Sequence, residues 1–342
     1  MFLIVVGLCF GSVTARLSGS IFYGNALLSQ VLSWKFISSW QDLSLHWAKI
    51  EIAGADKLPR DGTLKKNMII VTFIVSICAI LEHALSMMAA TGLHCPPAEY
   101  FERYILSSHG FLLHSYEYSL WVAIPIFLLS KLATILWNFQ DLIIILISMG
   151  LTSRYRRLNL KLYNIIISES CAQYNKVERL KTKRHSQAQA WRRLREAYVR
   201  QAELVRRVDD KLGALILLSN MNNLYFICLQ LFLGINNKQG PSLNRIYYIL
   251  SLSWLIVRAC SVVLAAAEIH QHSRNALPLL HTYLRGVYNV EAHRLKTQLK
   301  FDFVAIKGMG LFVLNRKLLL EVIAAILKYE LVLIQFDKHE NK

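Results

Sequence analysis

The chain has 342 residues, 54% of them hydrophobic, and a formal net charge of +17 at pH 7. A soluble domain is usually about 45–50% apolar, and here the excess lies in long runs with little charge, which excludes one solvated domain around a single core. The basic residues therefore lie between these runs, where cytosolic loops of membrane proteins collect them. Nucleic-acid binding would also explain the charge, but no basic patch lies on a segment of soluble composition, so no nucleic-acid partner is expected.

The apolar runs have the length of membrane-spanning helices, which need about 20 mainly apolar residues. Met1–Phe10 has no basic segment before it, which is typical of the end of a spanning helix whose beginning is missing and not of a cleaved signal peptide. Six further runs qualify as spans: Ile21–Ser39, Asn67–Thr91, Phe111–Leu151, Leu212–Gly234, Ile246–Ile269 and Gly308–Phe336. Together they predict an all-α multi-pass membrane protein with seven transmembrane helices.

The run Phe111–Leu151 is too long for one simple crossing, and Pro125, Lys131 and Asp141 interrupt it. It predicts either one long helix that projects from the bilayer or a broken helix. Helical spacing of apolar residues also continues through Trp191–Lys211 into the next span. This continuity predicts a second long helix that extends into the cytosol.

The charges of the loops predict the orientation of the spans. Residues 152–211 carry sixteen Lys and Arg against six Asp and Glu, and residues 273–307 are also basic. Both segments are cytosolic by the positive-inside rule. With seven spans, the N-terminus is then inside and the C-terminus outside, which is opposite to the orientation of G-protein-coupled receptors.

The last span carries a polar stripe. Glu321, Lys328 and Gln335 are seven residues apart and share one face of a helix. Ionisable groups are costly in hydrocarbon, so this face should meet protein or water. The stripe indicates a pore-lining helix. The alternatives are a polar face packed against a neighbouring helix, or a Lys328 side chain that extends to the membrane–water interface.

Polar and aromatic groups share faces on other spans, mostly toward the outer side. Tyr247, Ser251, Trp254 and Arg258 follow one helical face. Carboxylates and amides hold sugar hydroxyls, and aromatic rings cover the C–H face of a sugar. The alternative is interhelical hydrogen bonding and an aromatic belt. The candidate ligand-binding residues are Glu82, His83, His114, Glu117, Trp121, Asn223, Gln230, Tyr247 and Trp254.

No arrangement of residues indicates an enzyme, a metal site or a cofactor. The chain has no GxSxG, HExxH, Walker or dinucleotide motif in the expected context. Asp209 and Asp210 resemble a metal-binding acid pair, but they lie in a basic helix and are interpreted as solvated charges.

Several segments resemble insect gustatory receptors. The family's C-terminal signature is Thr-Tyr, five hydrophobic or variable positions and Gln-Phe, and Tyr329–Phe336 is similar to it. Further segments resemble the sugar-receptor branch: Phe22–Ser29, Leu81–Ser86, Trp137–Phe139 with Asp141–Leu142, Asn222–Leu231 and Val304–Phe312.

This resemblance implies a homotetrameric, ligand-gated, non-selective cation channel of the plasma membrane. The last helix would line the pore, with Gln335 and Phe336 at the gate after Tyr329. Residues 1–272 would form the ligand-binding spans with the cytosolic loop 152–211, residues 273–307 a cytosolic anchor, and residues 308–342 the pore helix with a short extracellular tail.

One departure from the signature leaves other functions open. Lys328 stands where the family has threonine, and a cation on the pore face would repel permeating cations unless Glu321 offsets it. The alternatives are a non-conducting or specificity-setting subunit of a heteromer, a receptor for a non-sugar tastant, and a transporter. The expected partners are a sugar ligand, membrane lipid and further receptor subunits.

Overall fold

A computed structural model describes residues 12–55, 58–59, 61–92, 95–109, 113, 118–174, 180–236 and 242–340. Within the helices, the side chains of residues 12–17, 53–55, 171–174, 180–186, 233–236, 242–243 and 329–340 are not described. The predicted span Met1–Phe10 lies outside the described residues.

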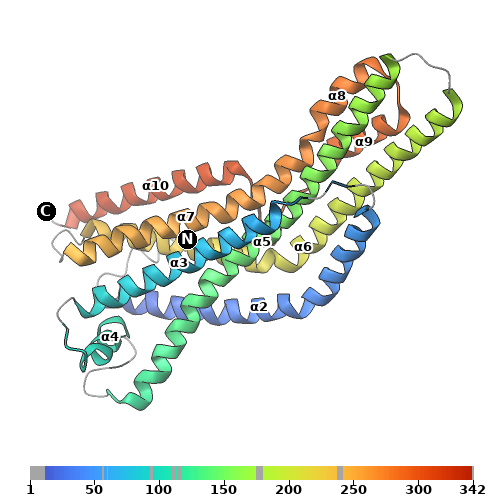
Figure 1. Ribbon diagram of the computed structural model, residues 1–342. Helices are drawn as coiled ribbons and strands as arrows, with labels where there is room; N and C mark the ends of the chain where they lie inside the picture. Colours follow the sequence, from blue (N-terminus) through green and yellow to red (C-terminus); the bar gives the residue numbers. More distant parts are fainter. Residues whose placement is uncertain are drawn as a thin grey trace.

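The described chain is a bundle of long helices with one short hairpin (Figure 1). Its elements are α2 (Ser12–Ala55), α3 (Leu64–Thr91), α4 (Tyr100–His109), α5 (Leu120–Tyr174), α6 (Leu180–Asn236), α7 (Ser242–Arg274), α8 (Ala276–Gly286), α9 (Val290–Phe301), β1 (Lys307–Gly308), β2 (Phe312–Val313) and α10 (Arg316–Glu340).

The two longest helices extend well beyond one membrane crossing. α5 has 55 residues and α6 has 57, so each is about 80 Å long against a hydrocarbon core of about 30 Å. Of the two predictions for Phe111–Leu151, the structure has the one long helix, although it begins only at Leu120. Pro125 lies near the start of α5 and does not end it. The predicted helix at Trp191–Lys211 is also confirmed, as part of α6.

The projecting ends of α5 and α6 form a compact core with α8 and α9 (Figure 1). Trp191 and Tyr198 are fully buried there, and their polar atoms are satisfied. The Trp191 indole N–H donates to Glu169 at 2.7 Å, and the Tyr198 hydroxyl donates to Asn159 at 2.6 Å. This end of the bundle therefore has the aromatic, hydrogen-bonded interior of a water-soluble domain.

The other part of the bundle leaves large apolar side chains uncovered. On α3, Phe73 and Ile80 are 65% and 68% exposed. Four helical segments of the described chain are long and apolar enough to cross a membrane: Leu64–Thr91, Leu120–Ser170, Gln187–Phe232 and Asn244–Gly286. The predicted span Ile21–Ser39 lies inside α2 but is not among these four.

The predicted last span, Gly308–Phe336, begins too early. Residues 307–313 form the β1–β2 hairpin, with Lys307 opposite Val313, and the helix begins only at Arg316. Met309 and Gly310 have positive φ angles of 52° and 75°, which a turn allows and a helix does not. Hydropathy does not reveal this hairpin, because residues 308–313 are mostly apolar, but Gly308 and Gly310 are typical turn residues.

The hairpin is fixed to α6 by two residues about one turn apart. The Asp209 carboxylate accepts the Lys307 backbone N–H at 2.6 Å. At Gly213 an added Cβ would lie 3.2 Å from the Met309 nitrogen, so a larger residue would push the hairpin away. Asp210 is exposed as expected, but the interpretation of Asp209 as a solvated charge is wrong.

The replacement Gly308→Ala should destabilise the hairpin. Its new Cβ would lie 2.4 Å from the Phe312 ring, so the ring must move, at a cost of about 1–3 kcal/mol. The matched control is Gly24→Ala in α2, where nothing lies within 4 Å of the added Cβ. Thermal unfolding in detergent should show a lower midpoint for Gly308→Ala only. Equal midpoints for the two variants would contradict the packing of Phe312 on Gly308.

Candidate functional site

The centre of the bundle contains a buried ion pair between α7 and α5. Arg258 Nε lies 2.8 Å from Asp141 Oδ2, and the two side chains are 3% and 0% exposed. The guanidinium also donates to Asn138 Oδ1 at 2.6 Å and lies 4.5 Å from the centroid of the Trp137 ring. A lone charge in such surroundings would be very costly, so each of these two groups depends on the other.

α6 completes the hydrogen bonds of this ion pair. Asn223 Nδ2 donates to Asp141 at 3.2 Å, and Ser219 donates to the other carboxylate oxygen. Asn223 Oδ1 accepts the Trp137 indole N–H at 2.9 Å. The predicted ligand residue Asn223 is therefore occupied by a polar network that joins α5, α6 and α7.

A second polar cluster joins α3, α6 and α7. Ser251 donates to Glu82 Oε1 at 2.8 Å and accepts from Gln230 Nε2 at 3.1 Å. The Tyr247 hydroxyl lies near Ser86, the Glu82 carboxylate and Ser251. Glu82, Gln230 and Tyr247 are thus brought together, and Ser251, which was not among the nine candidates, connects them.

His83 lies on the other side of α3, against α4 and α5. Its Nε2 contacts Lys131 Nζ, which also lies 4.2 Å from the centroid of the Phe127 ring. The Tyr104 hydroxyl lies 3.5 Å from Lys131 Nζ. Adjacent residues on α3 therefore face two clusters, one acidic at Glu82 and one basic at Lys131.

Of the remaining candidate ligand residues, Trp121 and Trp254 belong to neither of these hydrogen-bonded clusters. The Trp121 side chain is 89% exposed on the outside of α5. The Trp254 indole nitrogen is buried and has no hydrogen-bond partner among the described residues. His114 and Glu117 lie outside the described residues. Nor does the described chain gather three or more His, Cys, Asp or Glu side chains that could hold a metal ion.

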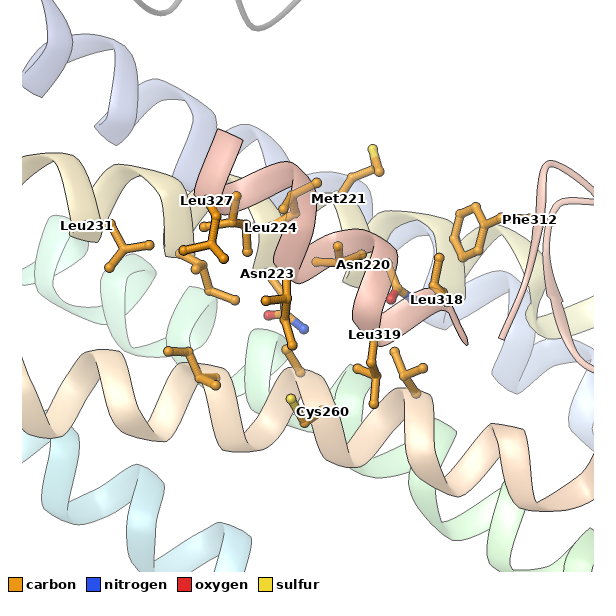
Figure 2. Close-up of a pocket in the computed structure, with 17 residues that line it drawn as sticks. Asn220, Met221, Asn223, Leu224, Leu231, Cys260, Phe312, Leu318, Leu319 and Leu327 are labelled. Atoms are coloured by element: carbon orange, nitrogen blue, oxygen red, sulfur yellow. The ribbon is translucent and has the colours of Figure 1, made fainter. Parts of the chain in front are cut away.

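A cavity of about 340 Å³ separates α10 from α6 and α7 (Figure 2). Its wall is apolar apart from Asn220 and Asn223, and α10 contributes Leu318, Leu319 and Leu327. Asn223 therefore belongs both to the network around the buried ion pair and to the wall that faces α10. One side chain links the centre of the bundle to the last helix.

The opposite face of α10 is uncovered in the single chain. Lys317, Glu321 and Lys328 are exposed, and Glu321 lies 3.2 Å from Lys317. Within one chain, Glu321 is therefore paired one turn toward the start of α10 and not with Lys328. The predicted gate residues Tyr329, Gln335 and Phe336 belong to α10, but their side chains lie outside the described residues.

The chain matches a known family over nearly its whole length. The profile described as the trehalose receptor matches residues 3–342. The chain belongs to the trehalose receptor family. The family and its relatives are receptors, so this is a gustatory receptor of the sugar branch and not an enzyme.

Two Drosophila melanogaster proteins illustrate this relationship. The receptor is 29% identical to the gustatory receptor for sugar taste 64a, over 97% of this chain and 72% of that protein. It is 30% identical to the gustatory receptor 5a for trehalose, over 91% of this chain and 68% of that protein.

The fold of the receptor is that of an insect olfactory receptor. The structure of olfactory receptor OR5 from Machilis hrabei in complex with eugenol superposes with a TM-score of 0.64, at 16% identity. The match covers 98% of this chain and 85% of that one. The receptor therefore has the helical fold of that olfactory receptor, and its family together with its long apolar helices indicates a multi-pass membrane protein.

Sequence reasoning noted Asp141 as an interruption of an apolar run and Arg258 as part of the helical face that begins at Tyr247, but it did not pair them. Opposite charges in separate spans are a signal for such a pair, because neither is stable alone in hydrocarbon. The signal does not identify which charges meet, since Glu82, Lys131 and other ionisable groups also lie in apolar runs.

Arg258→Leu should destabilise the receptor strongly, because it leaves the Asp141 carboxylate buried without its cation. The expected cost is about 3–5 kcal/mol, and replacing both residues by apolar ones should restore part of it. The control is Arg156→Leu, which removes the exposed ion pair to Glu268 and should have little effect. Thermal unfolding in detergent compares the three variants. If Arg258→Leu melts at the same temperature as Arg156→Leu, the ion pair does not stabilise the bundle.

Proposed function

We propose that the receptor is a sugar-gated, non-selective cation channel of the plasma membrane, in which α10 lines a central pore between subunits. The observation that carries this proposal is the division of α10 into two faces. One face lies over the cavity against α6 and α7, and the other presents Glu321 and Lys328, which its own chain does not cover. Charged groups on a membrane helix need water or another chain, and a pore between copies provides both.

The proposed architecture has seven spans, with the N-terminus inside and the C-terminus outside. The basic segments 152–211 and 273–307 are then cytosolic. They include the projecting ends of α5 and α6 with α8 and α9, and we propose this compact end as the anchor between the subunits of a homotetramer. Within residues 308–342, the pore would lie along α10, with Gln335 and Phe336 at the gate.

The proposed sugar site is the polar cluster of Glu82, Gln230, Ser251 and Tyr247. Carboxylate, amide and hydroxyl groups are the partners that sugar hydroxyls need. The curated relatives are named for trehalose and for sugar taste, which supports this ligand class. His83 and Trp254 are proposed as flanking contacts. Few such hydrogen bonds imply a millimolar response, or about 4 kcal/mol of binding free energy.

A route from this site to the gate follows packed polar groups. Ser251 and Arg258 lie two turns apart on α7, and Arg258 belongs to the same network as Asn223. Asn223 faces the cavity beneath α10. In the proposed mechanism, sugar binding shifts α7 and α6 and thereby favours a different position of α10. The ligand can move this equilibrium only by its preference for the open state.

A second function is a specificity-setting subunit of a heteromer that does not conduct alone. Lys328 in place of the family threonine favours it, because the cation faces away from its own chain and Glu321 pairs with Lys317. Electrophysiology of the receptor expressed alone, with a sugar panel, separates the two. Sugar-evoked cation currents support the homomeric channel, and currents that need another gustatory receptor support the subunit. Sugar uptake without a gated current would indicate a transporter.

Glu82→Gln should weaken the sugar response, because the carboxylate accepts hydrogen bonds more strongly than an amide. We expect the half-maximal sugar concentration to rise about tenfold, equivalent to about 1.4 kcal/mol. The control Glu102→Gln makes the same change at an exposed position on α4. Dose–response curves with surface-expression controls give the comparison, and an equal shift in the two variants would place the ligand elsewhere.

Lys328→Thr should raise the single-channel cation conductance, because it removes a positive charge from the proposed pore face. Lys300→Thr makes the same replacement at an exposed position on α9, outside the proposed pore helix, and should leave conductance unchanged. Patch-clamp recording at fixed voltage measures both variants, with co-expression where the receptor is silent alone. Unchanged conductance in Lys328→Thr places this side chain outside the pore.

A further inference from the structure

A second cavity, of about 660 Å³, lies between the end of α2, the start of α3 and the middle of α5. Part of its wall is apolar and includes Trp40, Trp47 and Met68. The Trp47 ring lies close to α5, since a Cβ on Gly150 would be 3.1 Å from it. The other part of the wall carries four charged side chains. A cavity with one apolar wall and one charged wall is complementary to an amphipathic ligand.

The charged wall includes two arginines that share one carboxylate. Arg154, whose side chain is 3% exposed, and Arg157 share the Glu51 carboxylate, and Arg157 Nη1 lies 2.5 Å from its Oε1. Arg157 Nε is buried and has no hydrogen-bond partner among the described residues. Arg157 lines the cavity and has five N–H donors, more than its bond to Glu51 uses, so its guanidinium can also donate to an anionic oxygen that enters the cavity.

The Asp61 carboxylate is held by its own neighbours. It accepts from Ser153 Oγ at 2.6 Å and from the backbone N–H groups of Thr63 and Leu64 at 3.1 and 3.2 Å. These bonds, first that from Ser153, lower the pKa of Asp61, so it is ionised at neutral pH. Asp61 and Glu51 therefore balance the two arginines and leave the wall itself neutral.

Three exposed lysines are neighbours in the chain of residues that line the cavity, and we call these lysines the basic rim. Lys49 and Lys65 follow the lining residues Ala48 and Leu64 in the chain, and they and Lys66 are exposed. In the proposed orientation this rim lies at the cytosolic surface of the membrane. Anionic phospholipids are concentrated in that leaflet and attract each nearby lysine or arginine by about 1 kcal/mol.

We propose that this cavity binds an anionic phospholipid of the cytosolic leaflet, with its phosphate at Arg157 and the basic rim and an acyl chain along Trp40, Trp47 and Met68. The site is separate from the polar cluster proposed for sugar. It requires only that the receptor lies in the membrane with this end inside, so it stands or fails independently of sugar gating.

The test uses the full chain purified in detergent and measures thermal stabilisation by added short-chain lipid. Ligands that bind only the folded state raise the unfolding midpoint according to their affinity. Dioctanoyl-phosphatidylserine should stabilise at a concentration at least about tenfold lower than dioctanoyl-phosphatidylcholine does. Glycerophosphate should have no such effect, because it lacks the acyl chains.

Three variants locate the effect. Arg157→Gln should abolish the preference for phosphatidylserine, and so should Ala48→Phe, which fills the cavity from an exposed lining position. Arg156→Gln should keep the preference, since it makes the same change one residue away on the side of α5 that faces Glu268. If Arg157→Gln does not fold, Ala48→Phe decides, because it leaves both ion pairs intact.

Several results would overturn the proposal. These are equal stabilisation by the two lipids, a preference that survives in Ala48→Phe, and an equal loss in Arg156→Gln and Arg157→Gln, which would reflect general surface charge. Stabilisation by glycerophosphate equal to that by phosphatidylserine would indicate a free-anion site and would also reject the lipid.

Discussion

The pairing of Arg258 with Asp141 constrains the arrangement of the helices around it. Both groups are almost completely buried, and a charge in low dielectric is tolerated only when it is paired and hydrogen-bonded. The remaining hydrogen bonds require Asn138 on α5 and Asn223 on α6 at fixed positions. The register of three long helices therefore depends on one ion pair, whereas apolar packing alone would allow them to slide.

The two ends of the long helices are suited to different surroundings, water at one end and lipid at the other. At the projecting end, Trp191 and Tyr198 are buried with satisfied polar atoms, as water requires. In the spans, large apolar side chains such as Phe73 stay uncovered, which is favourable only against lipid. α5 and α6 belong to both environments, so a change at one end can be transmitted mechanically along a continuous helix.

Most of the helices could be predicted from the sequence, because the hydropathy and charge of a segment depend only on its own residues. The polar candidates Glu82 and Gln230 were found for the same reason, since each stands out within its own span. Ser251, which connects them, was noted only as part of the polar face of its own helix, and a serine in a membrane helix does not reveal which other helix it contacts. The Asp141–Arg258 pair and the hairpin contact of Asp209 depend on contacts between distant segments, which periodicity does not encode.

The packing of α10 is that of a helix that can move. Asn223 of α6 bonds to the ion-pair network, and it also lines the cavity that separates α6 from α10. Along this cavity α10 lacks the close packing that would fix its position. The hairpin fixes the start of α10 through Asp209 and Gly213. A helix fixed at one end and loosely packed along its length can pivot about that end with little loss of contact. For the proposed channel, the hinge would then be the hairpin and the largest displacement would fall toward Gln335 and Phe336.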